Sequence, residues 1–198
     1  MSLIFRIILT CIAAAAAVSP AAGQTSNTAY AGGSPVVLTI PVTASVGGRC
    51  GFATGSAPSG SYSQNDFDKS GLSHDFGFAL NCTGPSRVAV VSAKGGLHNS
   101  AAAATGYANK APYSVTLKLV ANDGSQAQAT CAAETLASGS TCAFGGTAST
   151  SQGLRLASAS VNQPGSYLRV SAPAYSGPGT LVAGTYSDTL TVTVSPAI

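Results

Sequence analysis

Short runs in which apolar and polar residues alternate are the feature that most constrains this chain. In the last run, Leu190, Val192 and Val194 share one parity with Tyr186 and Asp188, while threonine and serine occupy the other parity. Because successive side chains of a β-strand point to opposite faces, this period of two predicts one buried face and one wet face, as in antiparallel sheets. We expect the three aliphatic residues to lie in the core and Tyr186 and Asp188 to hold the start of this C-terminal strand.

The same alternation recurs along the chain, and sequences typical of turns separate the runs. The predicted strands cover 36–46, 76–82, 88–91, 113–119, 154–156 and 168–170. Among the turn signals, Asn122-Asp123-Gly124 is a hairpin candidate. No segment after residue 23 shows a sustained helical period. Several short strands with this punctuation predict an all-β fold, a β-sandwich.

The first residues have the pattern of an export signal. Arg6 gives a positive start, Ile7–Val18 is apolar, and Ala21-Ala22-Gly23 offers small residues for cleavage. The apolar run of about 12 residues is shorter than the roughly 20 that span a bilayer. A lipid anchor on Cys11 is disfavoured, because this cysteine lies inside the apolar run and follows a threonine. We expect residues 1–23 to be a signal peptide and the protein to be exported without membrane insertion.

The remainder of the chain is expected to form one domain preceded by a tail. Residues 24–35 are mostly polar or small and are predicted to be a flexible N-terminal tail. Residues 36–198 contain no linker-like interruption and no internal repeat. Their length suits a single domain with a hydrophobic core of ordinary size.

Four cysteines follow the predicted signal peptide: Cys50, Cys82, Cys131 and Cys142. An even number in an exported chain fits a disulfide framework, for which three connectivities are possible. Zinc binding is disfavoured, because no two of these cysteines form a C-x-x-C pair. We predict Cys50–Cys82, since both residues close the ends of adjacent strands, and Cys131–Cys142 as a local clip.

The chain carries few charges. Charged residues make up 8% of it, with a formal net charge of +3, whereas a typical soluble domain has about 25%. Such a surface suits a protein that packs against copies of itself, or an exported protein selected for neutrality. No basic cluster of the kind that binds nucleic acid is present.

Residues that could carry catalysis are scattered. The two histidines, His74 and His98, are expected to be solvent-exposed loop residues rather than metal ligands. The chain has no G-x-S-x-G elbow, no glycine-rich phosphate loop and no paired carboxylates at a spacing typical of a catalytic site. We therefore expect no enzyme activity, no metal and no cofactor.

Four segments resemble the spore coat protein U domain family, whose fold is shared by major subunits of archaic (Csu-type) chaperone–usher pili. The segments are Pro41–Val46 leading to Cys50, Phe76–Cys82, Ala111–Leu117 and Ala183–Asp188. The likeness runs in order through 36–198 and is looser over 120–165. The chain departs from the family in ending on Ser195-Pro196-Ala197-Ile198 without an aromatic residue.

The resemblance implies an immunoglobulin-like β-sandwich that lacks one strand. A periplasmic chaperone would fill the gap first, and the N-terminal segment of the next identical or related subunit would replace it at the outer-membrane usher. The resemblance also implies a route through the periplasm to the cell surface or an extracellular fibre, a fimbrium that supports adhesion or biofilm formation. Alternating apolar residues expected in the donated strand are Val36, Leu38, Ile40 and Val42.

Two other hypotheses remain open at this point. One is a tip adhesin or other surface-binding domain, although adhesins of this type usually carry two domains. The other is a monomeric exported protein, such as an inhibitor or enzyme, that has no role in assembly. Neighbouring genes for a periplasmic chaperone and an outer-membrane usher would favour the pilus subunit.

Overall fold

The computed structural model describes residue 43 and residues 48–138 and 141–197. The predicted signal peptide (1–23), the tail (24–35) and the donor-strand candidates Val36, Leu38, Ile40 and Val42 lie outside these described residues. The described residues from 48 onward belong to one compact unit, Ser45–Ile198.

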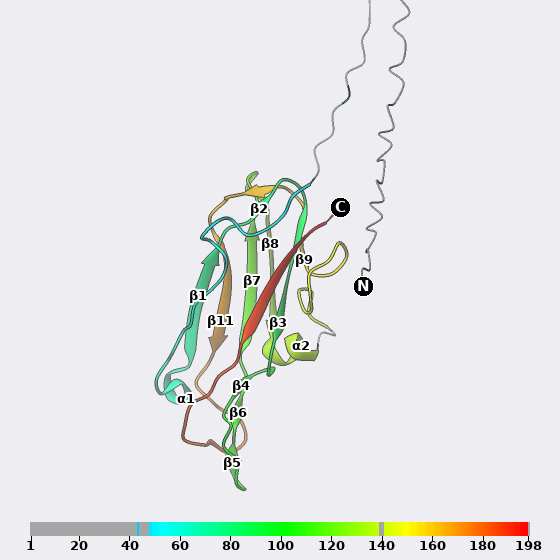
Figure 1. Cartoon of the computed structure of the whole chain (residues 1–198). Coiled ribbons are helices and arrows are strands. Elements are labelled where there is room, and N and C mark those ends of the chain that lie inside the picture. Colours follow the sequence, from blue (N-terminus) through cyan, green and yellow to red (C-terminus); the bar gives the residue numbers. More distant parts are fainter. Residues whose placement is uncertain (1–42, 44–47, 139–140, 198) are drawn as a thin grey trace, which may run out of the picture. The chain divides into compact units, whose positions relative to one another are not determined.

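Most of the regular structure is β-strand, which confirms the all-β prediction (Figure 1). Among the described residues, seven longer strands and two short helices form the frame. These are α1 (Phe67–Ser70), β1 (Leu72–Phe78), β3 (Ser86–Ser92), β7 (Ser114–Val120), β8 (Gln126–Ala132), α2 (Ala133–Ser138), β9 (Leu154–Leu156), β11 (Ser166–Ala172) and β13 (Leu190–Pro196). In the described part of the chain, neither helix is long and apolar enough to cross a membrane.

The longer strands form two antiparallel sheets. One has four strands in the order β1-β11-β7-β8, and the other has three in the order β13-β3-β9. Three two-stranded pairs complete the domain, and β12–β5 is the parallel one among them. The strands of these pairs are β2 (Asn81–Cys82) with β10 (Ser160–Val161), β4 (Leu97–His98) with β6 (Lys110–Ala111), and β5 (Tyr107–Ala108) with β12 (Thr180–Leu181).

A single hydrophobic core joins the two large sheets. It contains Val88 and Val90 of β3 together with Val115 and Leu117 of β7, all fully buried, and Leu156 of β9. Because alternate residues of each strand point inward, the aliphatic positions predicted from the period of two meet in one cluster. The alternation over 113–119 is therefore confirmed in detail: the inward positions of β7 and the tyrosine that precedes it are buried.

The run predicted as one strand over 76–82 is divided between two strands. β1 pairs with β11, whereas β2 pairs with β10. Between them the backbone of Ala79 bonds to the segment 53–56: its N–H donates to Ser56 and its C=O accepts from Ala53, at 3.2 and 2.9 Å. These bonds replace the ladder with β11, so the strand changes partner while its inward parity continues through Leu80 and Cys82.

The predicted turn Asn122-Asp123-Gly124 joins β7 to β8, which the alternation did not predict as a strand. Gly124 has φ of 82°, a left-handed conformation that glycine adopts readily. The Asp123 carboxylate accepts a hydrogen bond from the Ser125 N–H at 2.9 Å. The inward positions of β8 are small residues, Ala127 and Ala129 with Cys131, so the strand lacks the large apolar residues that would have identified it.

Both predicted disulfides are present, Cys50–Cys82 and Cys131–Cys142. The first joins the segment before β1 to β2 over a sequence separation of 32. The second joins the end of β8 to the loop after α2 over a separation of 11. The framework is therefore one long closure and one local clip.

The C-terminal strand starts later than predicted. β13 begins at Leu190, so Tyr186 and Asp188 precede it. Residues 186–188 do not continue the pairing of β13 with β3. Ser187 instead forms an isolated bridge with His98, and the Asp188 carboxylate accepts a hydrogen bond from the Lys94 N–H, in the turn between β3 and β4. Leu190, Val192 and Val194, which were predicted to be core residues, pack against the buried core and are themselves half-buried.

Candidate functional site

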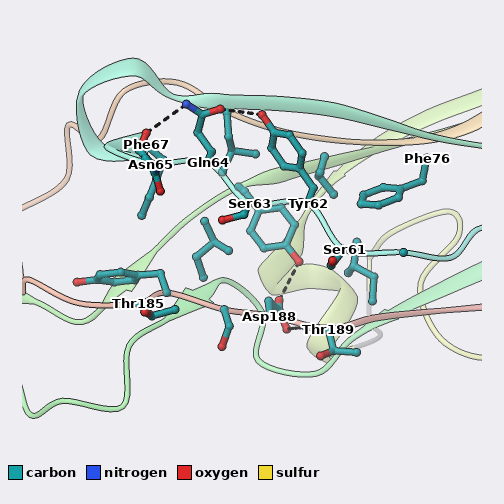
Figure 2. Close-up of a pocket in the computed structure, with 18 of the residues that line it drawn as sticks. Ser61, Tyr62, Ser63, Gln64, Asn65, Phe67, Phe76, Thr185, Asp188 and Thr189 are labelled. Atoms are coloured by element: carbon teal, nitrogen blue, oxygen red, sulfur yellow. Dashed lines mark hydrogen bonds between the residues drawn. The ribbon is translucent and has the colours of Figure 1, made fainter.

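A groove of about 1110 Å³ lies between the edge strands of the two large sheets. Its walls come from β1 on one side and from β13 and the residues before it on the other. Figure 2 shows Phe76 of β1 apart from Asp188 and Thr189, with the segment that carries Ser61 and Tyr62 between them. The groove therefore lies where the two sheets do not close on each other.

The floor of the groove is apolar. Leu72, Phe76, Val170, Leu190 and Val192 line it, and each is half-buried although it packs against the core. Large apolar side chains are usually buried in folded proteins. Their partial exposure follows from their position along the groove.

The outer edge of β13 has unpaired backbone groups in the described part of the chain. Val192 lies opposite Val90 in the register with β3. The N–H and C=O of Val90 bond to Phe144 and Gly146 at 2.7 and 3.2 Å, on the far side of β3. Since directly opposite residues of an antiparallel pair either exchange both bonds or neither, the backbone of Val192 points away from β3. The same parity gives Leu190 and Val194 the same direction.

A hydrogen-bonded carboxylate lies where β13 begins. One oxygen of Asp188 accepts hydrogen bonds from the hydroxyls of Ser92 and Tyr113 at 2.6 and 2.8 Å and from the Gly96 N–H at 3.3 Å. The other accepts from the N–H groups of Lys94 and Thr189 at 3.0 and 2.7 Å. Every hydrogen bond stabilises the ionised form, so the carboxylate is a structural clamp between the β3–β4 turn and β13.

Burial raises the pKa of Asp188, but the hydrogen bonds from Ser92 and Tyr113 outweigh it and hold that pKa below the usual value. Burial, and then the neighbouring carboxylate, raises the pKa of Tyr113 well above its usual range. The tyrosine therefore stays protonated and donates, while the aspartate stays ionised and accepts. This hydrogen-bonded pair therefore holds the groove wall in place.

Tyr186 lies further along the same wall. Its hydroxyl donates toward the carbonyls of Ala108 and Val182 at 2.9 and 3.0 Å, and its ring meets that of Phe67 edge to face at 5.5 Å between centroids. The sequence placed Tyr186 at the start of the last strand. In the structure it instead joins the β5 segment to α1.

The two histidines are not solvent-exposed loop residues, which corrects that prediction. His74 lies in β1 and is half-buried, with its ring against those of Tyr62 and Phe76. His98 lies in β4, and its backbone pairs with Ser187. In the described residues, no group of three or more histidine, cysteine, aspartate or glutamate side chains could hold a metal ion.

The sequence pattern predicted the strand that forms the β13 wall of the groove, but few residues of the opposite wall. Leu72 lies before the alternating run that predicted β1, and the segment 57–65 is a serine-rich loop without apolar periodicity. Val170 was predicted as a strand residue, but nothing in its run indicated that it would face an opening. Edge positions and core positions have the same alternation, so only the topology separates them.

The arrangement can bind an extended, apolar polypeptide segment. It offers half-buried side chains together with a strand edge that is unpaired among the described residues. In comparisons with protein-family models, with curated proteins and with solved structures, nothing matches this chain.

Proposed function

We propose that this chain is a structural subunit of a chaperone–usher type surface pilus or coat, assembled by donor-strand complementation. The observation that carries the proposal is the groove beside β13, where apolar residues are half-buried and backbone groups are unpaired in the described chain. In this proposal the domain is an immunoglobulin-like β-sandwich that lacks one strand, and a neighbouring copy supplies it. The assembled fibre contributes to adhesion or biofilm formation.

The groove meets both needs of strand addition, of which chaperone–pilin complementation is a known case. The outer edge of β13 offers backbone hydrogen bonds, which give affinity. The apolar floor, formed by Phe76, Val170 and Val192 among others, accepts alternate side chains, which give specificity. An exposed edge over an apolar floor otherwise promotes aggregation, so a dedicated partner strand is expected.

The segment that fits the groove is the N-terminal run of a second copy. Val36, Leu38, Ile40 and Val42 share one parity of the run, and Val37, Thr39 and Pro41 occupy the other. The run from 36 to 42 has as many residues as β13, whose length is seven. Strands of equal length can pair along their whole edge. Val36 and Leu38 are the residues furthest from Cys50, which ties the segment to its own domain, so they reach furthest into the neighbour.

Before assembly, a periplasmic chaperone would cover the groove, and the outer-membrane usher would bring successive subunits together. The two disulfides agree with passage through an oxidising compartment such as the periplasm. The low charge of the chain, 8%, agrees with a surface that packs against other copies. No nucleic acid, cofactor or catalytic group has a role in this proposal.

The test uses a matched pair of variants in the proposed donor segment. Leu38→Asp places a carboxylate on the parity that enters the groove, whereas Thr39→Asp places it on the opposite parity. The protein is exported together with its chaperone and usher, and SDS-resistant ladders are examined by electrophoresis without boiling. We expect ladders for the wild type and Thr39→Asp and their loss for Leu38→Asp.

A truncation supports the same test. Removing residues 24–40 should leave a folded, chaperone-bound subunit that cannot donate its strand. Ladders formed by this truncated protein, or by Leu38→Asp, would contradict the proposal. So would a wild-type protein that stays monomeric when it is exported together with the chaperone and usher.

A further inference from the structure

Residues 57–65, called the strap here, lie on the open side of the groove. Pro58 and the residues that follow it line the groove. Residues 61 to 65 of the strap are exposed, and Tyr62 has 37% of its surface accessible. Figure 2 shows Ser61, Tyr62 and Ser63 on one extended segment beside the pocket. The strap therefore covers the groove from outside.

Backbone hydrogen bonds hold the residues on either side of the strap but not the strap itself. Before it, Ser56 bonds through its backbone to Ala53 and Ala79. After it, the Asp66 carbonyl accepts from Lys69 and Ser70, and Asp68 accepts from the Tyr175 N–H at 2.8 Å. In the described chain, no residue from 57 to 65 makes a backbone–backbone hydrogen bond. The strap is thus not a strand, and it leaves the outer edge of β13 unpaired.

One aromatic contact holds the middle of the strap. The ring of Tyr62 stacks on that of His74 with centroids 4.3 Å apart and planes 11° from parallel. His74 in turn meets Phe76, a residue of the groove floor, edge to face at 4.7 Å. The Tyr62 hydroxyl bonds only within the strap, to Gln64 at 2.8 Å. Tyr62 therefore joins the strap to β1 through its ring.

We propose that the strap is a removable cover, which shields the groove while no partner strand is bound and leaves when a strand of the chaperone or of a neighbouring subunit enters. This inference rests on the proposed function, because it concerns access to the same groove. The strap is made largely of serine, glycine and polar residues, so it hides the apolar floor without filling it. The Tyr62–His74 stack sets how often the groove opens.

Displacement of the strap is favourable because a donated strand makes contacts with the groove that the strap does not make. A donated strand pairs with the free backbone groups of Leu190, Val192 and Val194 and inserts apolar side chains. The strap supplies neither, and its own backbone loses no ladder when it moves. The strap therefore keeps weakly binding segments out of the groove. A strand that forms backbone hydrogen bonds with the edge of β13 displaces it.

The first experiment measures how fast a donor peptide enters. The probe is a fluorescein-labelled peptide of residues 34–46, added to the dilute full-length chain from Gln24 onward and followed by fluorescence anisotropy. The variant is Tyr62→Ser, and the matched control is Tyr107→Ser, an exposed tyrosine that does not line the groove. We expect the association rate to rise about three- to tenfold for Tyr62→Ser, the range that the loss of one aromatic stack implies. The control should match the wild type.

The second experiment measures access without the donor peptide. Binding of 1-anilinonaphthalene-8-sulfonate reports exposed apolar surface, and its fluorescence should rise for Tyr62→Ser and not for Tyr107→Ser. If the peptide binds all three proteins at equal rates and the dye signal is unchanged, the cover is overturned and the proposed function stands. If the peptide binds none of them while the dye signal rises for Tyr62→Ser, the cover stands and the donor-strand function fails. Failure in both experiments overturns both.

Discussion

Tyr113 donates a hydrogen bond to Asp188 at 2.8 Å and so joins the residue before β7 to the wall that leads into β13. The two residues are 75 positions apart in the sequence. Tyr113 is buried and also lines the groove, whereas Asp188 is half-buried. The bond therefore links the core of the four-stranded sheet to the start of the edge strand that borders the groove.

Removing the Tyr113 hydroxyl should weaken the domain. For Tyr113→Phe we expect the free energy of unfolding to fall by about 1.5 kcal/mol, since a hydrogen bond to a charged group contributes roughly that much. Urea denaturation measures the change. Tyr107→Phe is the control, because Tyr107 is 54% exposed. A loss of equal size in both variants would show that the bond contributes nothing of its own.

The Asp188 clamp should make stability depend on acid pH. Its folded-state pKa is depressed, so the stability it contributes is present above its unfolded pKa and is lost as pH falls through the folded value. With an unfolded pKa of about 3.9, the loss lies below about pH 4. We expect Asp188→Asn to be less stable than the wild type at pH 7 and the difference to shrink toward pH 2. A difference that stays constant in thermal melts across this range would exclude ionisation as the cause.

The central strands could be predicted from the sequence because the alternation of their apolar and polar side chains identifies them. Val115, Leu117 and Leu119 alternate with polar residues, and all three are fully buried. β8 was missed because its inward residues are alanines and a cysteine. The break between β1 and β2 was missed because backbone hydrogen bonds from Ala79 cause it, and these leave no mark on the side-chain pattern.

The groove could be predicted only in part. Leu190, Val192 and Val194 were identified as the inward face of the last strand, but their half-burial depends on which strands become edges. Edge status is a property of strand order, which alternation does not encode. The Tyr62–His74 stack joins a loop to a strand over a contact that no local pattern predicts.

The two disulfides should contribute unequally. In the chain-entropy account, the longer Cys50–Cys82 loop stabilises by roughly 3–4 kcal/mol and the shorter Cys131–Cys142 loop by about 2–3 kcal/mol. We expect the Cys50→Ser/Cys82→Ser double variant to lose more stability than Cys131→Ser/Cys142→Ser in urea denaturation. Mass mapping of the non-reduced protein checks the pairing itself, and a Cys50–Cys131 peptide would contradict it.

Gly71 and Gly55 share a φ of 71°, but their surroundings differ. Gly71 also has ψ of −172°, a backbone conformation that is nearly restricted to glycine. A Cβ at Gly71 would lie 2.5 Å from the carbonyl oxygen of Ala172, whereas a Cβ at Gly55 meets nothing within 4 Å. Gly55→Ala should cost about 1–2 kcal/mol, the penalty of the left-handed conformation alone. Gly71→Ala should cost clearly more, because the contact with Ala172 and the backbone conformation both oppose a side chain. Equal losses for the two variants in thermal or urea unfolding would contradict this.

Val90 and Val192 lie opposite each other in the β3–β13 register. Substitutions at these two positions can distinguish an effect on folding from an effect on assembly. Val90 is fully buried, so Val90→Asp places an unpaired carboxylate in the core and should cost several kcal/mol. Val192 is half-buried on the groove floor, where a carboxylate can still reach water. We expect Val192→Asp to remain folded and protease-resistant while losing uptake of the peptide of residues 34–46, and Val90→Asp to be degraded on export. If Val192→Asp takes up the peptide at the wild-type rate, β13 does not border the binding groove; if it unfolds as readily as Val90→Asp, the groove floor is part of the closed core.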